Sequence, residues 1–147
     1  MARLRQLLSA PDVLSVFELG DSPFRETPYA GRVRHVSLLE ENGLLHIVFS
    51  AIGDAPESIL YTTMRMTGDW RQWKVGAIAE VLKPQTRYEC PDLPVTKSEV
   101  GEIDHPAQQL RGPALFRTRA SCISFTHSAG ARHRWRRGHD HAIIAPP

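Results

Sequence analysis

The sequence predicts an all-β protein whose best-defined part is a four-stranded antiparallel meander. Two runs rich in strand-forming residues, 34–39 and 44–50, are joined by Asn42-Gly43. Asn and Gly tolerate the positive φ angles of a two-residue type I′ turn, which makes this a strong hairpin signal. Two further runs follow closely, and turn-forming residues separate them. Such short spacing favours strands that pair with their neighbours in order.

The elements are expected in a simple order along the chain. Residues 1–30 are weakly patterned, with one short helical turn and one strand, and the turn-forming residues 20–23 end this part. After the hairpin, a third strand is expected over 58–63 and a fourth over 73–82, the latter with room for a helical stretch. A long polar connection, 83–106, leads to another strand at 109–116.

A four-stranded antiparallel meander is the unit of a β-propeller blade. A weak internal sequence similarity supports a second unit, because residues 34–39 and 111–116 both run from an arginine into a short apolar strand. We therefore predict a partial β-propeller, with one complete blade-like meander and the start of another, over residues 1–116.

The charge distribution separates residues 117–147 from the rest. This tail holds six arginines and one aspartate, whereas the preceding residues hold 12 basic and 15 acidic side chains. A shift of this kind marks a tail or a partner-binding arm. We expect a disordered tail or one translated out of frame, because a shifted frame can encode an aromatic-rich strand there.

Composition and spacing exclude several classes of function. No apolar run is long enough to cross a bilayer and no secretory leader is evident, so a cytoplasmic location without membrane contact is expected. Two distant cysteines suggest neither a disulfide framework nor a zinc site. His133, His139 and His141 match no standard metal pattern, so neither a metal nor a cofactor is expected. Nucleic acid is expected only through the basic run 132–137.

Five motifs carry a resemblance to a known family over about 60% of the chain. They are Gly31 to Val36, Phe49 to Glu57, Gly68 to Trp73, Tyr88 to Pro94 and Gln109 to Phe116. In these motifs the chain resembles uncharacterised bacterial relatives of the five-bladed β-propeller glycoside hydrolases, the arabinanase, xylosidase and levansucrase-like group. The resemblance implies a propeller fold and a carbohydrate ligand, without identifying the sugar.

Two departures from the family argue against independent catalysis. Where these propellers commonly carry Arg-Asp-Pro at the opening of a blade, this sequence has Arg111-Gly112-Pro113, so the carboxylate that orients the sugar is missing. A five-bladed ring also needs more blades than 147 residues supply. The open sheet edges of an incomplete ring would favour self-association.

Glycoside hydrolysis commonly needs two carboxyl groups, one acid and one nucleophile or base. The motifs place Asp54, Glu57 and Glu89 as the candidate catalytic residues. Ordinary turn chemistry at Asp54 and a solvated loop charge at Glu89 are the alternative readings.

Candidate sugar-binding residues lie in the same motifs. They are Arg34, His35, Asp92, Arg111 and Trp70. Arginine, histidine and aspartate hydrogen-bond sugar hydroxyls, and tryptophan offers a flat face to a sugar ring. A structural histidine and a packed tryptophan are the alternatives at His35 and Trp70.

The sequence thus favours a truncated glycoside-hydrolase-like propeller protein, which binds carbohydrate or retains residual hydrolysis at most. We expect the isolated chain not to act as an efficient enzyme. A small protein that binds polyanions through its basic tail, and a non-functional fragment, remain the alternatives.

Overall fold

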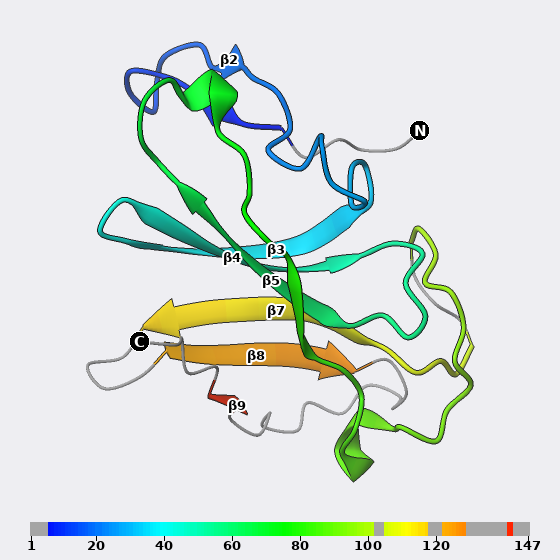
Figure 1. Cartoon of the computed structure of the whole chain (residues 1–147). Coiled ribbons are helices and arrows are strands. Elements are labelled where there is room, and N and C mark those ends of the chain that lie inside the picture. The colour runs from blue at the N-terminus through cyan, green and yellow to red at the C-terminus, as the bar shows by residue number, and fades with distance from the viewer. Residues whose placement is uncertain (1–5, 102–104, 118–121, 129–140, 143–147) are drawn as a thin grey trace.

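The computed structural model describes residues 6–101, 105–117, 122–128 and 141–142 of the chain (Figure 1). The described part consists of strands and two short 3-10 helices. These are β1 (Leu8–Ser9), β2 (Glu18–Leu19), β3 (Val33–Glu41), β4 (Leu44–Ala51), β5 (Ile59–Arg65), η1 (Trp70–Gln72), β6 (Ala79–Leu82), η2 (Arg87–Glu89), β7 (Leu110–Arg117), β8 (Cys122–Ser128) and β9 (His141–Ala142). The prediction of an all-β chain is confirmed.

The predicted meander is a four-stranded antiparallel sheet in the order β3-β4-β5-β6. Asn42 and Gly43 have φ angles of 51° and 75°, as a type I′ hairpin turn requires. The fourth strand is shorter than predicted because residues 73–78, which follow η1, are irregular; the Asp69 side chain caps η1 by accepting the Arg71 N–H. The N-terminal β1 and β2 form a separate two-stranded sheet.

A second antiparallel sheet, in the order β7-β8-β9, begins where the sequence predicts a new strand. In Figure 1, β3 and β7 start at the same side of the molecule and run in the same direction. The two strands pack together, and the Leu115 N–H donates to Ser37 Oγ at 2.7 Å. Within the described residues, neither sheet closes on itself.

The tail predicted to be disordered or out of frame contains β8 and the two residues of β9. Most of its other residues lie outside the described part of the chain.

Side chains alternate along β4 and supply two apolar layers. Ile47, Phe49 and Ala51 face a core formed with Phe24 and Met64 and covered by the N-terminal segment. On the opposite face, Val48 packs with Ile59 and with Leu110 of β7. The four-stranded sheet is therefore held between the N-terminal segment and the second sheet.

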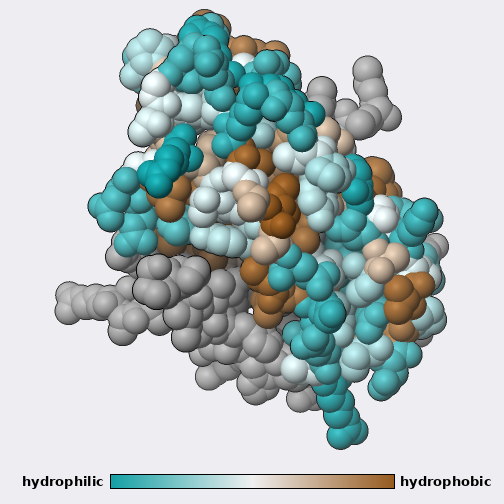
Figure 2. Space-filling model, viewed as in Figure 1, coloured by the Kyte–Doolittle hydropathy of each residue, from teal (hydrophilic) through white to brown (hydrophobic). Residues whose placement is uncertain are grey.

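The surface seen in Figure 2 is mostly polar, with apolar side chains gathered near the middle of the face. The most exposed large apolar side chains of the described residues lie between β1 and β2. Val13, Leu14 and Val16 are 87%, 94% and 93% exposed.

Candidate functional site

The two sheets are joined by a cluster of three charged side chains, Arg34, Glu57 and Arg111. Arg34 Nε donates to Glu57 Oε1 at 2.8 Å, and Arg34 Nη2 pairs with Glu57 Oε2. Arg111 Nε donates to the same Oε2 at 2.9 Å. Because Arg34 is the second residue of β3 and Arg111 is the second residue of β7, Glu57 connects the first strands of both sheets. Three of the sequence-predicted site residues are thus brought together.

Each of these arginines is followed by a residue in the left-handed region of backbone space. His35 has φ of 49° and Gly112 has φ of 63°. In both strands the register of the pairing shifts immediately after the arginine, as at a β-bulge. The weak sequence similarity between the two strands therefore corresponds to a repeated local geometry. It also gives Gly112 a backbone role, since glycine adopts this φ without strain.

Glu57 is fully buried, with no exposed surface, and its two oxygens accept three N–H groups from the arginines. Arg34 is 7% exposed and also donates from Nη1 to the Glu99 carbonyl at 2.8 Å. Burial lowers the pKa of Arg111, and the charge of Arg34 acts in the same direction, while Glu57 opposes both. A buried carboxylate is tolerated here because it is paired and hydrogen-bonded.

Asp54, the second candidate acid, is bound to the neighbouring Arg32. Arg32 Nη2 pairs with Asp54 Oδ1, and Arg32 Nε donates to the Ile52 carbonyl at 2.7 Å. Ser98 closes the same turn, because it accepts the Gly53 N–H at 3.0 Å and donates to the Ala51 carbonyl at 3.1 Å. The interactions of Asp54 are those of a stabilised turn.

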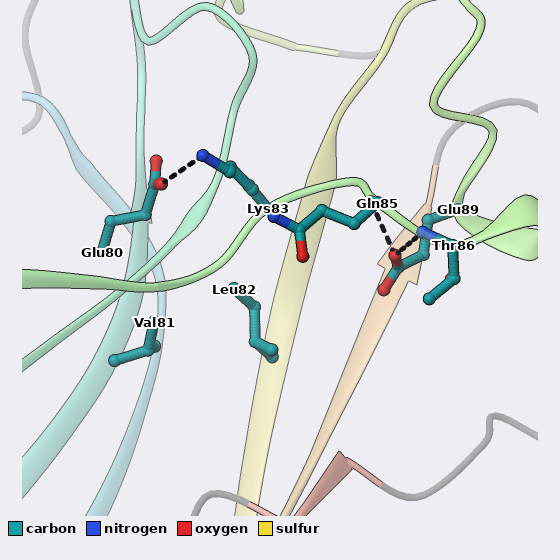
Figure 3. A pocket seen from close by; sticks show the side chains of 7 residues that line it. All are labelled: Glu80, Val81, Leu82, Lys83, Gln85, Thr86 and Glu89. Atoms are coloured by element: carbon teal, nitrogen blue, oxygen red, sulfur yellow. Dashed lines mark hydrogen bonds and ion pairs between the residues drawn. The ribbon is translucent and has the colours of Figure 1, made fainter.

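Glu89 lies elsewhere, at the end of η2, where it lines a pocket of about 320 Å³ (Figure 3). Its Oε2 accepts the backbone N–H groups of Gln85 and Thr86 at 2.9 and 2.8 Å, which caps the helix. The pocket is lined by Glu80, Val81, Leu82, Lys83, Gln85, Thr86 and Glu89. It therefore contains a second carboxylate, Glu80, 3.8 Å from Lys83.

Sequence reasoning missed Glu80. Glu80 lies inside a predicted strand and outside every family motif, so no signal marked it as a site residue. Only the folding of 80–89 around one pocket places it beside Glu89.

The remaining candidates are spread over the molecule. His35 is exposed and its Nδ1 lies 3.4 Å from Ser50 Oγ, while Asp92 is exposed in the long connection. Trp70 lies in η1, at the top of Figure 1, whereas η2 and Glu89 lie at the bottom. The Arg71 guanidinium sits 4.9 Å from the centre of the Trp70 ring, and Gly20 approaches the ring closely.

None of the helices in the described residues is long and apolar enough to cross a membrane. The described residues also contain no group of three or more histidine, cysteine, aspartate or glutamate side chains suited to a metal. The candidate polyanion-binding run 132–137 and two of the tail histidines considered as ligands, His133 and His139, lie outside the described residues.

Comparison with known proteins gives one curated relative and no assigned function. The uncharacterised protein R118 of Acanthamoeba polyphaga mimivirus is 39% identical over 103 residues. The match covers 69% of this chain and 29% of the viral protein, so the chain corresponds to a minor part of that relative. No family model matches, and no solved structure matches either.

Proposed function

We propose that the chain is part of a β-propeller of the glycoside-hydrolase type, and that it binds carbohydrate. In this proposal, β3–β6 are one blade and β7–β9 begin the next. The support is the packing of β3 beside β7 in the same direction, with an arginine and a bulge at the start of each. Repeated first strands arranged in this way are expected of neighbouring blades around an axis.

Binding is favoured over hydrolysis because the candidate acids are already held in ion pairs or hydrogen bonds. Hydrolysis needs one protonated carboxyl that can reach the glycosidic oxygen. Glu57 is buried between two arginines, and Asp54 is paired with Arg32. Glu89 accepts two backbone N–H groups at one of its oxygens. Each of the three carboxyl groups is therefore held as an acceptor.

The pocket lined by Glu80 and Glu89 is the observation that carries the ligand assignment. Its volume of about 320 Å³ is at the small end of the range for small-molecule sites. Carboxylate, amide and hydroxyl side chains on its wall suit sugar hydroxyls, and Val81 and Leu82 suit the apolar faces of a sugar ring. Figure 3 shows the two carboxylates on separate parts of the lining, with the Lys83 and Gln85 side chains between them.

Titration of the full chain with arabino- and xylo-oligosaccharides, followed by NMR, tests this proposal. We expect shifts confined to residues 80–89 and a loss of affinity of roughly tenfold in Glu80→Gln, since a charged hydrogen bond contributes about 1.5–3 kcal/mol. Glu99→Gln is the matched control, because the Glu99 side chain is exposed outside the pocket. Oligosaccharides that bind without perturbing 80–89, or that do not bind, would overturn the proposal.

Hydrolysis of aryl glycosides is the complementary measurement. The proposal predicts no turnover above background in the full chain. Turnover that disappears in Glu89→Gln would show instead that Glu89 acts as a catalytic acid or nucleophile, because the amide preserves a hydrogen-bond acceptor for the Gln85 and Thr86 N–H groups but cannot transfer a proton.

A further inference from the structure

The hairpin formed by β1 and β2 presents an apolar surface to solvent. Six of its large apolar side chains are each at least 53% exposed, and all lie within residues 8–19. Monomeric proteins rarely leave a contiguous apolar patch of more than a few hundred Å² uncovered. We call this surface the hairpin patch, and its members are Leu8, Val13, Leu14, Val16, Phe17 and Leu19.

One face of the hairpin is held against the body of the protein. Leu7 packs against the core cluster that contains Phe49. The Glu18 carboxylate pairs with Arg71 of η1, at the top of Figure 1. Because side chains alternate along a strand, the residues next to Leu7 and Glu18 in the sequence point away from this body.

The opposite face carries the apolar side chains of the two strands. Leu8 lies directly across from Leu19 in the register of the pair. Phe17, two residues before Leu19, continues this face by the same alternation. Glu18 is the charged residue of the two strands and points to the other face, where Arg71 binds it. An apolar face without charges has the composition of an interface core.

The loop between the strands extends the patch and is pre-organised. Asp12 Oδ1 accepts the Leu14 N–H at 2.8 Å, and Asp12 Oδ2 accepts the Ser15 hydroxyl at 2.8 Å. These bonds fix the turn while the Val13 and Leu14 side chains stay almost fully exposed. A surface fixed in this way loses less conformational entropy on association than a mobile one.

The exposed apolar area matches one side of a dimer interface. A fully exposed side chain of this kind presents on the order of 100 Å² of apolar surface. At its exposures the hairpin patch presents on the order of 400 Å². An interface of standard size buries about 800 Å² on each partner, and slightly more than half of that area is apolar. The patch therefore supplies the apolar area that each subunit of a stable dimer needs.

We propose that the hairpin patch is a dimer interface, covered by the same patch of a second copy of the chain. In a twofold arrangement the uncharged face of one copy meets the uncharged face of the other, and both patches are covered at once. This contact is made face to face by side chains, unlike the edge-to-edge strand pairing expected from the open sheets. It goes beyond the proposed carbohydrate binding and does not depend on it.

Sedimentation velocity of the full chain over a wide range of concentrations tests the proposal. We expect a reversible dimer with a Kd on the order of micromolar. On dilution, the NMR resonances that shift should belong to residues 8–19. A chain that stays monomeric at every concentration would overturn the proposal, and so would dilution shifts confined to other residues.

Charged substitutions in the patch locate the contact. Leu14→Asp and Val16→Asp each place a carboxylate in the apolar contact of both copies, and each should raise the Kd at least roughly 100-fold. Both should keep the melting temperature of the monomer, because these side chains are exposed in it. Val100→Asp, at an apolar residue of the long connection that is 82% exposed, is the matched control and should leave the Kd unchanged. Association undiminished in both patch variants would assign it to another surface, such as the sheet edges, and overturn the proposal.

A mixed sample identifies the occupant of the patch. In a dimer of one ¹³C-labelled and one unlabelled copy, we expect intermolecular NOEs from the Leu8 and Leu19 methyl groups to the same patch of the other copy. Flotation with phosphatidylcholine vesicles probes the competing occupant, a lipid surface. A monomer that floats with these vesicles through residues 8–19 would overturn the dimer.

Discussion

Arg34 and Arg111 are 77 positions apart in the chain, yet both donate a guanidinium N–H to the same carboxylate, that of Glu57. Each arginine is the second residue of the first strand of its sheet, and each precedes a residue with positive φ. The cluster therefore aligns the starts of β3 and β7. Buried ion pairs of this kind add little net stability, because desolvation offsets much of the attraction.

Removing Arg34 should destabilise the chain more than removing Arg111. Arg34 donates to both oxygens of Glu57, whereas Arg111 donates to one. Loss of a buried partner costs about 3–5 kcal/mol when a charge is left uncompensated. Because Arg111 still pairs with Glu57 in Arg34→Met, we expect that variant to cost less than this range and Arg111→Met to cost less again, as measured by urea unfolding. Equal costs for the two variants would contradict the assigned geometry.

The double variant Arg34→Met/Glu57→Gln supplies the control for that comparison. It removes the buried carboxylate together with its principal partner, and so leaves the largely buried Arg111 without its carboxylate. We expect the double variant to be less stable than Arg34→Met alone, by about 1 kcal/mol or more, because an unpaired buried charge is costly. A double variant more stable than the single one would mean that the Arg111–Glu57 pair contributes nothing to stability.

Substitutions at Gly112 should destabilise the fold through backbone strain and not through steric overlap. A Cβ at this glycine meets no heavy atom within 4 Å, but its φ is 63°. Left-handed backbone costs an L-residue roughly 1–2 kcal/mol, and less for Asp or Asn. We expect the free energy of unfolding to be highest for Gly112→Asp, lower for Gly112→Ala and lowest for Gly112→Val. Ala114→Val, at an exposed position farther along β7, should be nearly neutral.

The sequence contained enough information for the sheet but not for the charged cluster. The Asn42-Gly43 turn and alternating apolar residues determine the hairpin through local geometry. Pairing of Glu57 with arginines on two different strands depends on how the two sheets pack, which no local pattern reveals. The similarity between the two strands was visible in the sequence. Its structural counterpart, a bulge after each arginine, could be seen only from the backbone angles and the strand register.

The long connection illustrates the same limit. Its proline-spotted composition predicted a loop, and most of it is irregular. Ser98 nevertheless binds the turn after β4 through Ala51 and Gly53, and it is 5% exposed. Neither this buried anchor nor the pocket around Glu89 could be derived from composition, since the anchor depends on contacts distant in sequence and the pocket on the way residues 80–89 fold.

Gly20→Ala should disturb Trp70. A Cβ on Gly20 would lie 2.4 Å from Cζ3 of the ring, and the Arg71 guanidinium lies against the same ring. We expect a loss of about 1–3 kcal/mol, typical of overpacking, with a change in tryptophan fluorescence. Gly76→Ala is the matched control, because its Cβ would meet the nearest atom at an ordinary 3.5 Å. Unchanged stability in Gly20→Ala would show that the ring can move freely.

The pair formed by Glu26 and Lys74 should contribute a small pH dependence. Lys74 Nζ lies 2.6 and 2.7 Å from the two Glu26 oxygens, and this hydrogen bond, followed by the charge of Lys74, lowers the pKa of Glu26 below its ordinary value of 4.5. A carboxyl with a lowered pKa in the folded state stabilises the fold above the unfolded-state value. That stabilisation is lost as the pH falls through the folded-state value.

Lys74→Gln should therefore raise the pKa of Glu26 toward 4.5, as followed by NMR titration of its carboxyl carbon. The pH dependence of unfolding just below that value should become shallower, because the folded and unfolded states then bind the proton equally well. Lys97→Gln should leave the Glu26 titration unchanged, since Lys97 lies in the distant long connection. A Glu26 pKa that stays low in Lys74→Gln would assign the shift to a group other than Lys74.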